Sequence, residues 1–317
     1  MPTDVLTSPS HSSATAAPDV LYLLSPSYSG STLLTFMLAT HPEIATIGEL
    51  KASSMGDIAA YHCSCGALLT QCSFWTQVEK QMRENGGEFS FAEFGTHLRN
   101  GPALFRKSIN ATVRHPLLAF SGSMALKTIP ASRARLKKVM DQNARMIEII
   151  TRLQNGKVFL DGSKDPERLN QFLAHMGDKV KVVHLIRDAR GVCNSYMRHY
   201  QVGMPVAARE WVKTDLACKR VMSRVPARNA LMLKYEDLCA APEAALASIF
   251  KLAGIGGAPT NRRSALSDFH ILGNAMRLEF GKPIKLDEKW RASLGPADLA
   301  TFEQMAGSMN RAYGYNQ

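Results

Sequence analysis

The stretch that most constrains this chain is residues 20–49, a short apolar run, a loop of small residues and a second apolar segment. The run VLYLL at 20–24 is typical of a buried parallel strand. Residues 25–30 (SPSYSG) predict a tight polar loop, and residues 31–40 predict a helix that ends before His41 and Pro42. The chain therefore begins its ordered part with a strand, a loop and a helix.

This order of elements predicts an anion-binding site. Unpaired backbone N–H groups and the positive end of the helix dipole converge at the loop, and Gly30 lets a phosphate approach the backbone closely. Ser29, Ser31 and Thr32 add hydroxyl donors. The loop differs from the P-loop of NTPases, because Ser25 stands where that motif has its first glycine and Ser31 stands where it has its lysine.

Composition limits the ligands that such a loop can serve. The 317 residues are 45% hydrophobic, enough for a large core, and no apolar run reaches the roughly 20 residues that span a bilayer. The net charge of +11 suits an anionic ligand, but the basic residues are scattered and form no tract typical of nucleic-acid binding. Residues 1–18 predict a disordered tail without signal-peptide character, and six cysteines without an export signal indicate a soluble cytoplasmic protein with reduced thiols.

Three further strands are predicted, and polar residues follow each of them. KVFL at 157–160 precedes Lys164 and a helix start at Asp165-Pro166. VKVVHLI at 180–186 runs directly into Arg187, and ALMLK at 230–234 runs into Tyr235. Helices between the strands predict an α/β fold with a parallel sheet, and ligands bind such sheets at the carboxyl ends of the strands.

The motifs S-G-S-T-L-L with a following H-P and G-E, strand-R-D-A-R with Ser195 eight residues after Arg187, and Y-E-D-L resemble those of sulfotransferases that use PAPS (3′-phosphoadenosine 5′-phosphosulfate). The resemblance covers residues 20–50 and 157–317. It is to the bacterial sulfotransferase-like branch of the family, and some motifs are also similar to those of tyrosylprotein sulfotransferases. It implies a P-loop-NTPase-like parallel sheet with helices on both faces, and transfer of the sulfuryl group from PAPS to an acceptor hydroxyl or amine, leaving the product PAP. Residues 19–317 would then form a single domain.

The resemblance also implies roles for individual residues. Arg187 and Ser195 would bind the 3′-phosphate, Tyr235 would lie near the adenine, and Arg277 would contact the nucleotide from a glycine-containing C-terminal segment. Donor contacts are further implied for the loop residues Tyr28, Ser29, Gly30, Ser31, Thr32 and Leu33.

Glu49, in the G-E match, is the predicted general base, provided that burial raises its pKa. Lys164, in the K-D-P match, is predicted to stabilise the leaving phosphate. Rival bases are His41, His62 and His115.

Tyr28 departs from the family, which usually has Lys or Arg before S-G-[ST]-T. A phenol brings no positive charge near neutral pH. Either Lys164 and the helix dipole suffice, or Lys127 or Arg106 supplies the charge, or the chain binds PAP and PAPS without transferring sulfate. A P-loop kinase, with Asp161 as the magnesium ligand, is the remaining alternative.

Residues 51–155 are predicted to form a helical insertion that shapes the acceptor site, with breaks at Gly86-Gly87 and Gly101-Pro102. Cys63, Cys65 and Cys72, with His62 beside them, could supply four zinc ligands. A single C-x-C with an adjacent His is a poor tetrahedral set, so we interpret these cysteines as small hydrophobic residues in an ordered loop and expect no metal.

Overall fold

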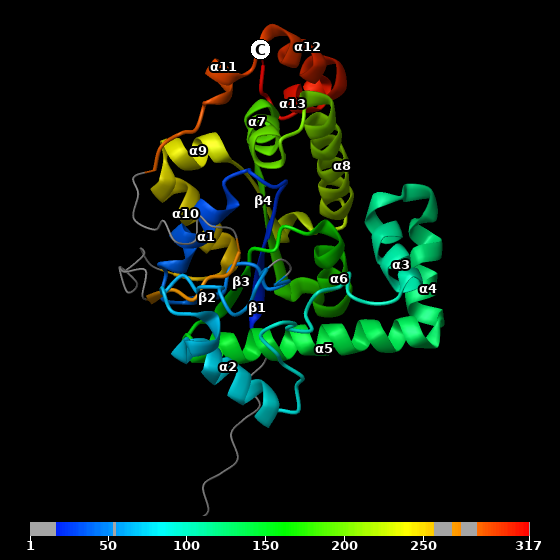
Figure 1. Ribbon diagram of the computed structural model, residues 1–317, viewed down its shortest axis with the longest axis vertical. Coiled ribbons are helices and arrows are strands. Elements are labelled where there is room, and N and C mark those ends of the chain that lie inside the picture. The colour runs from blue at the N-terminus through cyan, green and yellow to red at the C-terminus, as the bar shows by residue number, and fades with distance from the viewer. Residues whose placement is uncertain (1–16, 53–54, 257–267, 274–283, 317) are drawn as a thin grey trace, which may run out of the picture.

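The computed structural model describes residues 17–52, 55–256, 268–273 and 284–316. Five parallel strands form one sheet in the order β2-β3-β1-β4-β5, with β1 at its centre (Figure 1). The strands are β1 (Asp19–Leu24), β2 (Ile44–Thr46), β3 (Val158–Asp161), β4 (Val180–Ile186) and β5 (Ala230–Lys234). The predicted α/β fold with a parallel sheet is confirmed.

Alternation along β1 divides the core between the two faces of the sheet. Val20, Tyr22 and Leu24 belong to a cluster that includes residues of α2 (Ser73–Glu84), α5 (Pro130–Leu153), α6 (Pro166–Met176) and α8 (Met204–Met222). Leu21 and Leu23 belong to a second cluster, with residues of α1 (Ser31–Ala39) and α10 (Pro242–Ala253). Because successive side chains of a strand point to opposite faces, a wholly apolar β1 requires helices on both sides.

The helices occupy the segments between and after the strands (Figure 1). Those that follow β1, β3, β4 and β5 along the chain are α1 (Ser31–Ala39), α6 (Pro166–Met176), α7 (Ala189–Tyr200), α8 (Met204–Met222), α9 (Tyr235–Ala240) and α10 (Pro242–Ala253). The C-terminal helices are α11 (Trp290–Ser293), α12 (Pro296–Phe302) and α13 (Ser308–Arg311).

The segment between β2 and β3 is helical, as the sequence predicts. Its helices are α2 (Ser73–Glu84), α3 (Ala103–Arg114), α4 (Ala119–Thr128) and α5 (Pro130–Leu153). The predicted breaks fall where α2 has ended and where α3 begins. The long helix α5 passes along the sheet and reaches the α3–α4 pair, which lies on the side of the molecule away from α1 (Figure 1).

One strand was not predicted. Ile44–Thr46 forms the edge strand β2, which pairs with β3. Three residues carry too little pattern for a strand to be recognised from sequence, because the alternation of apolar and polar residues needs at least four. The consequence for the site is direct, since β2 positions Glu49 three residues beyond its end. Of the helices that the structure describes, none is long and apolar enough to cross a membrane.

Candidate functional site

The loop between β1 and α1 has the backbone form of an anion cradle. Gly30, the residue before α1, has φ 88°, and no side chain caps the helix. The hydroxyl groups of Ser25 and Ser29 are buried and have no hydrogen-bond partner within the described parts of the chain. Buried hydroxyls without partners are costly unless a ligand satisfies them. Ser31 and Thr32 follow on the first turn of α1, whereas the side chain of Leu33 packs against the second core cluster.

The ring of Tyr235 packs against this loop at Gly30. A Cβ atom on Gly30 would lie 2.4 Å from the Tyr235 ring, so only glycine fits at this position. The Tyr235 ring also contacts Arg187, whose guanidinium carbon lies 4.6 Å from the ring centroid. The Tyr235 hydroxyl donates to the Lys285 carbonyl and accepts from the Asp287 amide, both at 3.3 Å. Burial raises the pKa of Tyr235 to about 12, so the phenol is neutral.

Arg187 is buried at the end of β4 and joins three segments. It donates to the Tyr28 carbonyl at 3.0 Å and to the Asp287 carbonyl at 2.5 Å, and it lies 3.3 Å from the Asp287 carboxylate. Ser195 is half-buried two turns along α7. The predicted cation therefore lies beside the loop, held by an acidic group that an incoming anion could replace.

The side chain of Tyr28 packs against α7. Its φ is 67°, and its ring lies 6.1 Å from the ring of Tyr196 and 5.7 Å from that of His199. Burial, and then the neighbouring hydroxyl of Tyr200, raise the pKa of Tyr28. The phenol at the usual Lys/Arg position is therefore uncharged and occupied by aromatic contacts.

Glu49 and Lys164, the two predicted catalytic residues, form an ion pair. Lys164 Nζ donates to Glu49 Oε1 at 2.5 Å, and both side chains are mostly buried. They come from the ends of neighbouring strands, Glu49 after β2 and Lys164 after β3, and Lys164 has φ 63°. The small pocket between them is lined by Ser31, Thr32, Thr35, Gly48, Glu49, Gly162, Lys164, Ile271, Leu272 and Gly273. Ser31 and Thr32, at the start of α1, therefore line the same pocket as Glu49 and Lys164.

The pKa of Glu49 differs from our expectation. Burial raises it, but the charges of Lys164 and Lys51 and their hydrogen bonds outweigh burial and hold the pKa below its ordinary value. Lys51 Nζ lies 3.6 Å from the other carboxylate oxygen. The condition that we set for a general base, a pKa raised by burial, is therefore not met in this state, because the ammonium groups of Lys164 and Lys51 both lie close to the Glu49 carboxylate.

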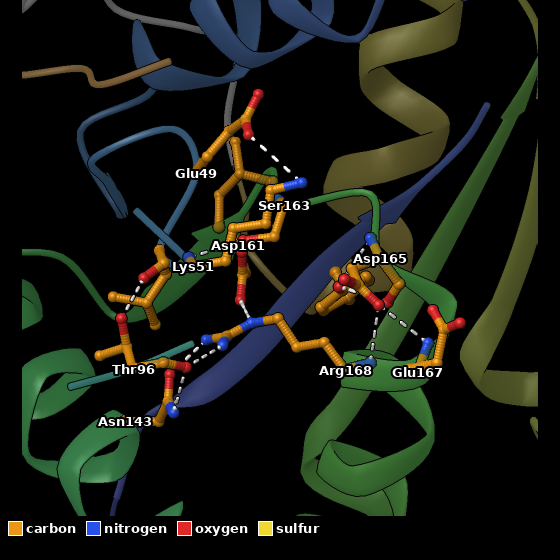
Figure 2. A network of polar contacts seen from close by, with 12 residues as sticks. Glu49, Lys51, Thr96, Asn143, Asp161, Ser163, Asp165, Glu167 and Arg168 are labelled. Atoms are coloured by element: carbon orange, nitrogen blue, oxygen red, sulfur yellow. Dashed lines mark hydrogen bonds and ion pairs between the residues drawn. The ribbon is translucent and has the colours of Figure 1, made fainter. Parts of the chain in front are cut away.

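Below this pair lies a network that the sequence did not reveal (Figure 2). Arg168 Nε donates to Asp161 at 2.8 Å, in an ion pair with almost no solvent exposure. Arg168 also donates to the Thr96 carbonyl at 2.9 Å and to Asn143 Oδ1. The only available signal is the spacing, because Asp161 ends the strand and Arg168 lies in the first turn of the next helix. Because Asp161 is paired with Arg168, it is not available as the magnesium ligand of a kinase.

A second pocket, of about 270 Å³, adjoins the ion pair through Lys51. Its other lining residues come from the inserted region: Ala52, Ala92, Glu93, Phe94, Gly95, Thr96, His97 and Asn100. Thr96 donates to the Leu50 carbonyl at 2.6 Å and so fixes this segment next to Glu49 (Figure 2). Sequence reasoning missed Lys51 and His97, which no motif marks.

Several predicted alternatives lie away from the Glu49 pocket. His41 is buried at the turn after α1, where it accepts from the Glu43 amide, and His115 ends α3. The exposed Arg106 and Lys127 lie on α3 and α4, and neither lines the pocket. The remaining predicted donor contact, Arg277, lies outside the described residues.

The chain belongs to the sulfotransferase family: a profile of that family matches residues 22–258. Among solved structures, the chain is similar to the sulfotransferase domain from the Synechococcus PCC 7002 olefin synthase, with 20% identity and a TM-score of 0.55 over 96% of this chain and 98% of that one. It is also similar to a sulfotransferase domain from the curacin biosynthetic pathway, with 18% identity and a TM-score of 0.50 over 92% and 97% of the two chains. At these identities the likeness shows the fold. No curated protein sequence matches significantly.

Proposed function

We propose that this protein transfers a sulfuryl group from PAPS to a hydroxyl or amine of an acceptor, with Glu49 as general base and Lys164 as the cation at the leaving phosphate. The observation that carries the proposal is the Glu49–Lys164 ion pair at 2.5 Å, in a pocket that is also lined by residues of the first turn of α1. The chemistry needs a proton acceptor and a cation on either side of the reacting sulfur. The family and the fold support the transferase class.

The donor would be held by groups that are now unsatisfied or replaceable. The loop hydroxyls of Ser25 and Ser29 lack partners, and the backbone N–H groups of the first turn of α1 have no side-chain cap. Arg187 would exchange Asp287 for the 3′-phosphate, and Ser195 would donate to the same group. Tyr235 would support the loop and hold Arg187 in place. Tyr28 would contribute through its backbone.

The ion pair suggests how the base is activated. While Lys164 bonds to Glu49, the carboxylate is a weak base because its pKa is lowered. A donor phosphate would attract the Lys164 ammonium away from the carboxylate, and the pKa of Glu49 would rise because burial would then act with less opposition. The base would therefore strengthen only when the donor is bound.

The 270 Å³ pocket next to Lys51 supports an acceptor site built by the inserted region 51–155. Its polar lining includes Lys51, Glu93, His97 and Asn100. An acceptor bound there would lie close to the Glu49 carboxylate, because Lys51 lines this pocket and also forms an ion pair with Glu49. The lining favours a polar acceptor that can form hydrogen bonds.

The nucleotide can be tested by thermal unfolding without an acceptor. PAP at about 100 times its dissociation constant should raise the melting temperature on the order of 5 °C without magnesium. ATP with magnesium should have no comparable effect. The reverse result would favour a kinase and would refute the proposal.

Tyr28 favours one alternative, a protein that binds PAP and PAPS without transfer. The two are separated by PAP release from PAPS over a panel of hydroxyl and amine acceptors. Lys164→Met should reduce that release by a factor on the order of 100 to 1000, the usual loss when a group that stabilises developing charge is removed. No release by the wild type at saturating PAPS would support the binding protein instead.

A further inference from the structure

Four side chains outside the proposed active site converge on one point. Cys63, Cys65, Cys72 and His270 each offer one ligand atom, and these atoms all lie within 4.8 Å of one another. The sulfurs of Cys65 and Cys72 are 3.7 Å apart. His270 Nδ1 lies 3.4 Å from the Cys72 sulfur and 3.7 Å from the Cys63 sulfur.

These separations are those of a tetrahedral metal site. With Zn–S bonds of ~2.3 Å and a Zn–N bond of ~2.0–2.1 Å, tetrahedral angles put two sulfurs about 3.8 Å apart and a sulfur and a nitrogen about 3.6 Å apart. A disulfide needs its sulfurs at about 2.05 Å, far closer than the Cys65–Cys72 distance of 3.7 Å. Three sulfurs and one imidazole nitrogen in this arrangement are a donor set typical of zinc.

The backbone places the three cysteines without any metal. A tight turn brings Cys63 and Cys65 together, with the Cys63 amide donating to the Ala67 carbonyl and the Gly66 amide to the Cys63 carbonyl, both at 2.9 Å. Cys72 is the residue before α2, a helix of 12 residues. The positive end of that helix favours the negative charge that thiolate ligands carry.

His270 is positioned independently by Ser64, which lies between two of the cysteines. The Ser64 hydroxyl donates to the Phe269 carbonyl and accepts from the Ile271 amide, both at 2.8 Å, and so binds the backbone on either side of His270. The His270 ring stacks on Phe74, with centroids 4.4 Å apart and planes 3° from parallel. Its Nδ1 therefore has a fixed direction toward the sulfurs.

We propose that Cys63, Cys65, Cys72 and His270 bind one structural zinc ion. All four coordination positions are then filled by the chain, which suits a structural role and leaves no position for a substrate. Each ligating thiol releases its proton to solvent on binding. The expectation of no metal considered His62 as the fourth ligand; His62 is exposed, and the fourth donor comes instead from a residue 198 positions after Cys72.

Zinc bound here would hold in place the segment 271–273, which lines the pocket of the proposed active site. The segment after His270 lines the Glu49 pocket with Ile271, Leu272 and Gly273. The Leu272 amide donates to the Ile47 carbonyl at 2.7 Å, in the segment that leads to Glu49. The metal would therefore join the 63–72 turn to a strip of chain in contact with the catalytic pair.

The test is the metal content of the full chain, which does not depend on sulfotransferase activity. Purified under reducing conditions, incubated with zinc and passed through gel filtration, the wild type should retain about one zinc per chain by elemental analysis. Cys65→Ser and His270→Ala should lose most of it, and Cys239→Ser, a change at a half-buried cysteine outside the cluster, should keep it. Cys65 is the most exposed of the three cysteines, so its replacement disturbs packing least.

Cobalt(II) gives a second readout, and its main measurement is made on the wild type itself. The wild type loaded with cobalt should show thiolate-to-cobalt charge-transfer bands and the strong visible bands of tetrahedral coordination, and His270→Cys should shift those bands while still binding. Wild type that retains no zinc and shows no such bands would overturn the proposal. So would a disulfide between two of these cysteines in protein purified without added oxidant, or equal zinc in wild type and Cys65→Ser.

Discussion

Glu49 carries the most informative charge in the site, because its environment contains opposing influences. Burial acts to raise its pKa, and Lys164 and Lys51 lower it by more. A carboxyl group whose folded pKa is below its unfolded value stabilises the fold above the unfolded pKa. That contribution is lost as the pH falls from the unfolded pKa through the folded one.

We therefore expect Glu49→Gln to lower the free energy of unfolding at neutral pH by about 1–3 kcal/mol, the cost of a lost hydrogen bond to a charged group. The difference between wild type and variant should shrink as the pH falls below the ordinary glutamate value of 4.5. Chemical unfolding from about pH 7 to pH 3 measures it. Glu88→Gln, which removes an exposed ion pair with Lys138, is the control and should change stability less. Parallel curves for wild type and Glu49→Gln would contradict the lowered pKa.

Tyr28 provides a second prediction at the residue scale. Its ring packs on Tyr196 and His199 and its hydroxyl neighbours Tyr200, so the hydroxyl is not a donor ligand in our account. Tyr28→Phe should bind PAP within about threefold of wild type, measured by calorimetry, because the loop backbone is unchanged. A loss of about tenfold or more would show that the phenol itself binds the nucleotide.

At this scale the sequence predicted the residues that follow strands and missed their partners. Glu49, Lys164 and Arg187 could be selected because a motif or a strand end marks each of them. Lys51, Asp287 and Arg168 could not, because their contacts depend on distances between segments that no local pattern encodes. The lowered pKa of Glu49 could not be foreseen for the same reason, since it depends on Lys51 and Lys164 acting together on one carboxylate.

In the proposed function, donor binding depends on the loop between β1 and α1, in which Gly30 has no room for a side chain. Both a left-handed φ of 88° and the Tyr235 ring at 2.4 Å from a virtual Cβ exclude a side chain. Gly30→Ala should destabilise the protein by about 1–3 kcal/mol, through strain and overpacking together. It should also weaken PAP binding, because the loop must move away from Tyr235.

Gly254→Ala is the matched control, since Gly254 also has a positive φ of 68° but has open space around its virtual Cβ. It should cost less, and PAP affinity should stay unchanged. Urea unfolding and calorimetry measure both effects. Equal losses in the two variants would mean that backbone strain alone, and not the contact with Tyr235, constrains the loop.

Strands and helices with a clear local sequence pattern were predictable, and very short strands were not. The strands β1, β3, β4 and β5 could be recognised because each is a continuous apolar run followed by a polar segment. The three-residue β2 has no such pattern, and its place at the edge of the sheet depends on pairing with β3. The start of α6 was predicted from the Asp165 cap and the proline that follows it, which are local signals.

At the scale of the whole molecule, the inserted helices and the sheet meet at the proposed site. Arg99, from the insertion, lies 3.0 Å from Glu167 and 3.5 Å from Asp165 at the start of α6. The sequence predicted a helical insertion that shapes the acceptor site but not these ion pairs, because no motif marks Arg99. The approach of His270 to Cys72 was equally unpredictable, since 198 residues separate them.

Calorimetric titration of PAP, without magnesium, into wild type, Arg187→Ala and Arg228→Ala measures whether the chain binds the proposed nucleotide through Arg187. We expect micromolar or tighter binding to wild type and a loss of about tenfold or more in Arg187→Ala, because a charge-assisted contact with a phosphate is removed. Arg228, an exposed residue paired with Asp178, is the control, and its replacement should leave the affinity unchanged. No binding of PAP to the wild type would contradict the proposed donor and, with it, the roles of Glu49 and Lys164.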